Sequence, residues 1–121
     1  MSYHQDWLMR QIEAITAMLG YILSGRSVST VTVEALDETQ SGENELYLQL
    51  QALVRKEKIC EAENLLYEAM EDPSRQVLDA AARFYADLNQ FSDETLEKCN
   101  FSRSEIMDGL TEVCKIFCIP I

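Results

Sequence analysis

Apolar residues recur every three or four positions through most of this chain, and that spacing restricts what it can fold into. The pattern is clearest in residues 6–25, DWLMRQIEAITAMLGYILSG. In a helix over 5–24, a single arc of about 160° holds eight large apolar side chains of residues 7–23, with Gln11 as the one polar residue among them. The members of the arc are Trp7, Leu8, Ile12, Ile15, Met18, Leu19, Ile22 and Leu23.

The same spacing resumes after residue 45 and predicts an all-α fold of five or six helices arranged as antiparallel hairpins. Two apolar stripes lie on either side of residues 55–58, RKEK, which leave room only for a tight turn. Asp72 and Pro73 are expected to end the second of these helices and to start the third, with Asp72 as its N-cap. The stripe of the third helix is Val77, Ala81, Tyr85 and Leu88.

A short sequence pattern that occurs twice near the C-terminus predicts two further helix starts. FSDETL (91–96) and FSRSEI (101–106) each place a capping serine after a phenylalanine that can pack onto an aliphatic residue. Ser102 and Glu105 also form a capping-box pair, so the last helix is expected over 103–117. Its inward residues are predicted to be Ile106, Leu110, Val113, Cys114 and Phe117.

The segment between the first helix and the rest shows no periodicity. It is rich in Ser, Thr and acidic residues, as linkers are. We therefore divide a single domain into an N-terminal amphipathic helix (1–25), an acidic linker (26–44) and a helical-hairpin body (45–121).

The amino-acid composition argues against several classes of partner. The chain of 121 residues has 21 acidic and 10 basic side chains, a formal charge of −11, which is unfavourable for binding nucleic acid or anionic lipid. Neither a secretory signal nor an apolar run long enough to span a membrane is visible. The four cysteines lack metal-knuckle spacing and are most simply reduced thiols, so we expect a cytoplasmic protein.

No catalytic constellation emerges from the sequence. His4 is the only histidine, and glycine-rich phosphate loops are absent. We therefore predict no catalytic residue, no cofactor and no metal site. Carboxylate pairs such as Asp108 with Glu112 are more typical of a solvated face, and cysteines of a packed core, than of a cation site. Tyrosines 47, 67 and 85 are expected either to close the core or to line one groove.

Two resemblances rest on particular residues. EAENLLYEAM (61–70), preceded by a helix and a turn and followed by Asp-Pro, resembles the second helix of a tetratricopeptide repeat over residues 46–73, with Ala62 as the small residue at the helix crossing. The chain as a whole resembles a small uncharacterised family of helical proteins, mostly from Gram-positive bacteria. The motifs are Asp-aromatic-aliphatic-Met-Arg-Gln-Ile at 6–12 and Ala-Glu-Asn-Leu-Leu at 62–66. This second resemblance implies a fold and a cytoplasmic setting but no activity.

The apolar face of the first helix needs cover, either from its own chain or from a second copy. The 4-3-4-3 spacing along it favours a homodimer. We predict an interface formed by Trp7, Leu8, Ile12, Ile15, Leu19 and Ile22. The leading hypothesis is a non-catalytic protein-protein interaction or scaffold module. The alternative is a small-molecule or metal-responsive protein that uses acidic and cysteine side chains.

Overall fold

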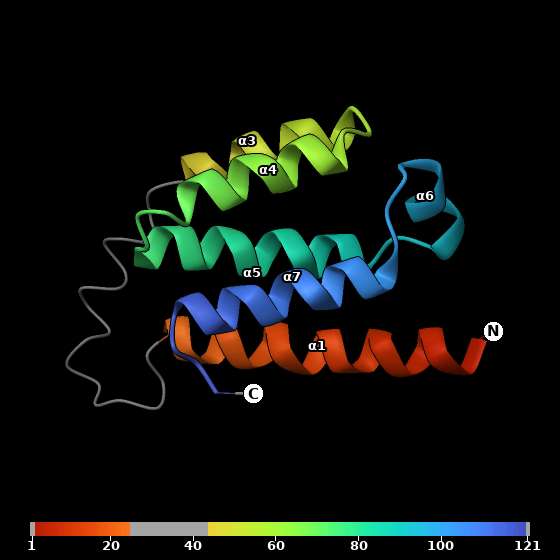
Figure 1. The fold of residues 1–121 in the computed structure, drawn as a ribbon, viewed down its shortest axis with the longest axis horizontal. Coiled ribbons are helices and arrows are strands. Elements are labelled where there is room, and N and C mark those ends of the chain that lie inside the picture. The colour runs from red at the N-terminus through yellow and green to blue at the C-terminus, as the bar shows by residue number, and fades with distance from the viewer. Residues whose placement is uncertain (1, 25–43, 121) are drawn as a thin grey trace.

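The computed structural model describes residues 2–24 and 44–120, and every regular element among them is an α-helix (Figure 1). The described helices are α1 (Ser2–Ser24), α3 (Glu45–Arg55), α4 (Ile59–Ala69), α5 (Arg75–Asn89), α6 (Asp93–Lys98) and α7 (Arg103–Ile116). The predicted all-α fold is confirmed. The predicted linker, except for its last residue, Asn44, lies outside the described residues.

Serine side chains begin two of the helices where the sequence predicts them. The Ser92 hydroxyl accepts a hydrogen bond from the backbone N–H of Thr95 at 3.1 Å. Ser102 accepts one from the N–H of Glu105 at 3.2 Å, and the Glu105 carboxylate accepts one from the Ser102 N–H at 2.9 Å. The predicted capping box is therefore confirmed. Each such cap contributes about 1 kcal/mol of stability.

The start of α5 differs from the prediction, because Ser74 rather than Asp72 is the N-cap. The Ser74 hydroxyl accepts a hydrogen bond from the Val77 N–H at 3.2 Å, and the helix begins one residue after the serine. Pro73 therefore precedes the cap instead of opening the helix. Asp72 belongs to the turn after α4, where its N–H donates to the Ala69 carbonyl at 3.1 Å.

Three helices end on the same kind of turn, although none has a glycine at the turning residue. The residues in the left-handed conformation are Glu57 (φ 63°), Asn100 (φ 63°) and Cys118 (φ 59°). At the end of α3, the N–H of Lys58 donates to the Leu53 carbonyl at 2.9 Å and that of Glu57 donates to Val54 at 2.8 Å. These paired bonds form a Schellman motif, and α6 and α7 close with the same pair.

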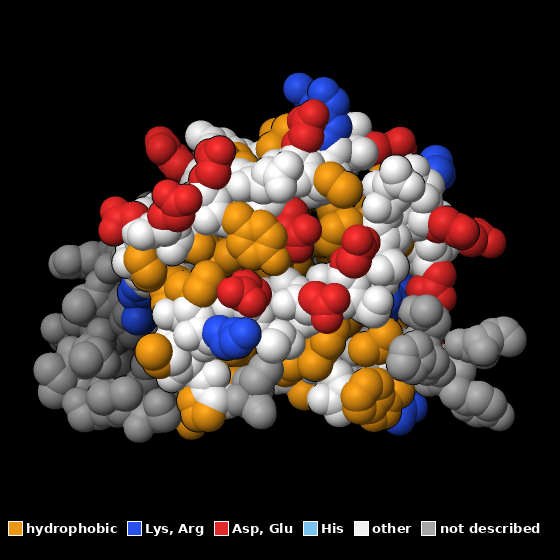
Figure 2. Space-filling model, in the orientation of Figure 1, with side chains coloured by type: hydrophobic (Ala, Val, Ile, Leu, Met, Phe, Trp, Pro, Cys, Tyr) orange, Lys and Arg blue, Asp and Glu red, His pale blue; other side chains and the backbone are white. Residues whose placement is uncertain are grey.

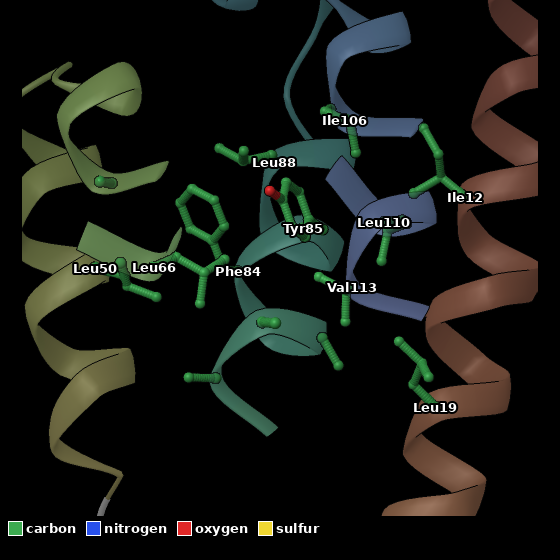
Figure 3. Close-up of a cluster of buried hydrophobic side chains, with 14 of the residues drawn as sticks. Ile12, Leu19, Leu50, Leu66, Phe84, Tyr85, Leu88, Ile106, Leu110 and Val113 are labelled. Atoms are coloured by element: carbon green, nitrogen blue, oxygen red, sulfur yellow. The ribbon is translucent and has the colours of Figure 1, made fainter. Parts of the chain in front are cut away.

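The core forms around α5, which packs against α1, α3, α4 and α7. The α3–α4 hairpin lies on one side of α5, and α1 and α7 lie on the other (Figure 1). Nine of the fifteen residues of α5 are buried, and they include all four of its predicted stripe. Figure 3 shows apolar side chains from both sides converging on Phe84 and Tyr85. A helix covered on several sides needs apolar residues around most of its circumference.

Helix α1 packs on its own chain, against α5 and α7. Five side chains between 0% and 8% exposed face inward: Leu8, Ile12, Ile15, Leu19 and Leu23. The Asn89 side-chain amide donates to the Met9 carbonyl at 3.1 Å, and the Arg75 guanidinium donates to the Leu23 carbonyl. A cation at the C-terminal end of a helix is electrostatically favourable. The chain itself therefore covers the inner side of α1.

The buried guanidinium of Arg103 joins the ends of three helices. Its two terminal nitrogens donate to the Asn89 backbone oxygen at 2.9 Å, to the Asn89 side-chain oxygen at 3.1 Å and to the Phe91 carbonyl at 2.9 Å. It also pairs with the Asp93 carboxylate at 2.6 Å. Arg103 is 4% exposed and Asn89 1% exposed, so the guanidinium satisfies oxygens at the buried end of α5.

Replacing Arg103 should therefore cost far more than replacing a surface arginine. We expect Arg103→Leu to lower the free energy of unfolding by about 3 kcal/mol in urea denaturation, because buried acceptors lose their donor. The matched control is Arg83→Leu, which removes an exposed ion pair with Asp79 at 3.2 Å and should cost less than about 1 kcal/mol. Equal losses from the two variants would contradict the assigned role of Arg103.

Candidate functional site

Side chains from α4 and α7 form the feature that we call the tyrosine–carboxylate patch, defined as Glu63, Tyr67, Glu105, Asp108 and Glu112. The two α4 residues are one helical turn apart, and the three α7 residues are spaced three and four apart, so each set shares one face of its helix. Figure 2 shows acidic side chains around hydrophobic surface between α4 and α7. Tyr67 is 37% exposed at this surface.

Tyr85 of α5 supports the patch from inside. Its side chain is fully buried, and its hydroxyl donates to the Glu63 carboxylate at 2.7 Å. Burial raises the pKa of Tyr85 far above its ordinary value, and the charge of Glu63 raises it further. The hydroxyl therefore keeps its proton and acts as a fixed donor to Glu63.

The patch concentrates like charges around two partly buried groups. Burial raises the pKa of Glu63, and the charges of Glu105 and Asp108 add to this against the opposing hydrogen bond from Tyr85. Burial also raises the pKa of Tyr67, with Glu63 as the next cause. Within residues 6–24 and 44–120, none of the patch carboxylates forms a salt bridge. The patch carboxylates are therefore not paired in salt bridges with the described side chains.

The raised pKa of Glu63 predicts a pH-dependent effect of Glu63→Gln, which keeps an acceptor for Tyr85 but removes the charge. Below the ordinary value of 4.5, the protonated carboxyl contributes stability, and this contribution is lost as pH rises through the raised pKa. We expect the free energy of unfolding of the variant relative to wild type to be higher at pH 7 than at pH 4. Urea denaturation at both pH values measures this difference.

The control for that experiment is Glu61→Gln on the same helix, at an exposed position. The change with pH should be larger for Glu63→Gln than for the control. If the two variants respond equally to pH, the environment assigned to Glu63 is wrong.

Gly109 lets α7 approach Tyr85 closely. A methyl group built at Gly109 would lie 2.3 Å from the Tyr85 hydroxyl oxygen and 2.5 Å from the ring carbon that carries it. Because the Tyr85 ring is buried and its hydroxyl is bonded to Glu63, the ring has little freedom to move away. The missing side chain at Gly109 therefore sets how closely α7 packs on Tyr85 beneath the patch.

Two glycine-to-alanine changes should have opposite signs. We expect Gly109→Ala to destabilise the fold by about 1–3 kcal/mol, because overpacking exceeds the gain in helix propensity. Gly20→Ala in α1 meets nothing within 4 Å and should stabilise the fold by roughly 0.5–1 kcal/mol. Thermal denaturation of both variants tests this, and a rise in Tm for Gly109→Ala would contradict the close packing.

Tyr47 lies apart from the patch, so the structure brings together only two of the three tyrosines that the sequence suggested for one groove. Its hydroxyl donates to Asp87 at 2.5 Å, and the Arg83 guanidinium lies 5.2 Å from the ring centroid. Burial and the hydrogen bond to Asp87 raise the pKa of Tyr47 to about 12. The Tyr47 side chain therefore links α3 to α5.

The cysteines divide between core and surface. Cys99 and Cys114 are buried, and burial raises the pKa of both thiols. Cys60 and Cys118 are exposed free thiols. In the described part of the chain, no group of three or more His, Cys, Asp or Glu side chains is placed to hold a metal ion.

The six residues predicted as an interface are separated by the structure. Four of them are buried within the chain: Leu8, Ile12, Ile15 and Leu19. Trp7 and Ile22 are 55% and 39% exposed. On another side of α1, a groove of about 360 Å³ runs between small residues of α1, such as Ala17 and Gly20, and Ala82 and Arg83 of α5.

Sequence analysis missed Glu63 and Glu105 as patch residues. The available signal was the helical spacing of acidic residues at 105, 108 and 112, which places three carboxylates on one face of α7. The position of that face opposite Tyr67 depends on how α4 and α7 pack around α5, and no local pattern encodes this.

Among residues 2–24 and 44–120, no helix is both long and apolar enough to cross a membrane. The chain belongs to DUF6483, a family of unknown function whose model matches residues 2–118. Searches of curated proteins and of solved structures found no match. Membership of an uncharacterised family, predicted from the sequence, is confirmed.

Proposed function

We propose that this member of the family is a non-catalytic protein-protein interaction module whose tyrosine–carboxylate patch receives a basic segment of another protein. The observation that carries the proposal is a group of four carboxylates on α4 and α7. Glu63, Asp108 and Glu112 lie near Tyr67, and Glu105 lies near Glu63. Arginine and lysine side chains complement such a surface in two ways. They pair with carboxylates, and they stack on aromatic rings.

Crowding of like charge strengthens the proposal. Glu63 is held beside Glu105 and Asp108 in a partly buried setting, which disfavours its ionised form. A cationic partner side chain would relieve this repulsion on binding. The overall charge of −11 would also speed the encounter with a basic partner, and raised salt would weaken it.

We also propose that the chain self-associates through α1. Because Leu8, Ile12, Ile15 and Leu19 pack inside the chain, the exposed residues of the same helix, Trp7 among them, are the ones that would meet a second copy. The tetratricopeptide-like character of the α3–α4 hairpin and a cytoplasmic location in a bacterium remain parts of the proposal. The hairpin geometry and the absence of a membrane-spanning helix among the described residues are compatible with them.

Binding of a short Arg–Ala repeat peptide tests the role of the patch. Calorimetry at low salt should detect binding to the wild-type chain, and the double variant Asp108→Asn/Glu112→Gln should weaken it roughly tenfold, about 1.4 kcal/mol. Raised salt should weaken binding to the wild type, because the contacts are electrostatic.

The matched control is Glu45→Gln/Glu94→Gln, which removes the same charge from exposed positions on α3 and α6. This double variant should retain nearly wild-type affinity. Equal weakening in the two double variants would show that net charge rather than the patch attracts the peptide. A wild-type chain that does not bind the peptide at low salt would refute the proposal.

A further inference from the structure

The chain buries only one side of α1 and leaves large apolar side chains of this helix exposed. Beside the buried stripe runs a second row, here called the α1 strip, at positions spaced 4-3-4-3. The strip consists of Trp7, Gln11, Ala14, Met18 and Tyr21. Trp7 is 55% exposed and Tyr21 51% exposed, Ala14 is exposed, and Gln11 and Met18 are half-buried. Such spacing forms a continuous seam along one side of a helix.

The strip is nearly symmetric about its centre. Trp7 and Tyr21 stand seven residues on either side of Ala14, about 10 Å away along the helix axis. The residues at 11 and 18 are placed three and four residues from it. The large aromatic groups are therefore at the two ends and the smallest side chain is at the middle. This arrangement suits a helix that crosses a copy of itself, because the small residue lets the two backbones approach.

From this symmetry, and resting on the self-association proposed above, we infer that two copies pair α1 against α1 in antiparallel orientation around a two-fold axis at Ala14. Trp7 then packs on the partner's Tyr21, and Tyr21 packs on the partner's Trp7. A two-fold interface requires one surface to be complementary to itself. The strip meets this requirement, because reversing its direction exchanges Trp7 for Tyr21, and both are exposed aromatic residues.

Charge favours a second copy at this face. Helix α1 has only three Asp, Glu, Lys or Arg residues in 23, namely Asp6, Arg10 and Glu13, in a chain of net charge −11. Two copies that approached through α4 and α7 would bring their acidic patches together. In Figure 2 the acidic side chains gather over those helices, and none is visible along α1 from this side. The α1 face is where two copies repel each other least.

The strip is short, so the dimer should be reversible. Five side chains from each copy bury an area at the low end for specific interfaces, below roughly 1,200 Å² in total. We therefore expect a dissociation constant in the micromolar range. Dilution should release monomers and shift the fluorescence of the single tryptophan, Trp7, to longer wavelength as the ring returns to water.

Disulfide trapping tests the register. The background is Cys60→Ser/Cys118→Ser, which removes the exposed thiols, and every variant is first checked for helicity by circular dichroism. On mild oxidation, Ala14→Cys should form a covalent dimer, because the axis brings the two copies of position 14 within disulfide reach. Leu48→Cys, exposed on α3, is the control and should remain monomeric on the gel.

The orientation follows from two further variants. Trp7→Cys and Tyr21→Cys should each fail to cross-link alone but should cross-link when mixed. Cross-linking of each variant with itself would indicate a parallel pair and would overturn the inference. Light scattering on a sizing column separates the two levels of the proposal. A dimer without cross-links at position 14 refutes the antiparallel register and leaves self-association standing, whereas a strict monomer at millimolar concentration, well above the expected dissociation constant, refutes both.

Affinity gives an independent test that needs no cysteine. We expect Trp7→Ser to weaken the dimer at least tenfold in analytical ultracentrifugation, whereas Leu48→Ser, which removes another exposed apolar side chain, should leave it unchanged. Both positions are exposed, so both variants should fold. Equal affinities for Trp7→Ser and wild type would contradict the assigned pairing of Trp7 with the partner's Tyr21.

Discussion

Burial of α5 on several sides is the constraint from which the remaining structure follows. A helix covered by α1, α3, α4 and α7 fixes the place of each of them, because each buries its own apolar stripe against the same rod. Consecutive alanines at 80–82 keep these contacts close. The arrangement leaves the outer sides of α4 and α7 on one surface and the outer side of α1 on another, and these two surfaces carry the proposals made above.

Those two surfaces have opposite physical character. The tyrosine–carboxylate patch is negative and lies over a buried hydrogen bond from Tyr85 to Glu63. The α1 strip is apolar except for Gln11 and contains no charged side chain. A basic partner and a second copy therefore need not compete, since charge brings one to the patch and apolar area brings the other to the strip. A dimer built on α1 would present two patches, which would strengthen the binding of a partner that has two basic segments.

Local physics explains which sequence predictions were confirmed. Helix periodicity and the serine caps at Ser92 and Ser102 act over a few residues, so they can be read from the chain itself. Asp72 and Ser74 are both acceptable caps, and the choice between them depends on where the turn after α4 ends, which no local rule decides. The same limit applies to the patch. Its acidic row on α7 is visible in the sequence, but its meeting with Tyr67 is a tertiary event. For α1, periodicity identified an apolar arc but not which half of it the chain would cover.

The three helix ends that turn without glycine have a consequence for the dynamics of the chain. A left-handed conformation costs a non-glycine residue on the order of 1 kcal/mol, although asparagine tolerates it better than glutamate or cysteine. Local unfolding at Glu57 and Cys118 would relieve this conformational cost. Amide protons around these turns should therefore exchange with solvent before those of α5. The backbone strain of the molecule thus lies in turns at helix ends, outside the buried central helix α5. Natural variation toward glycine at these two positions would remove this backbone strain without altering either surface.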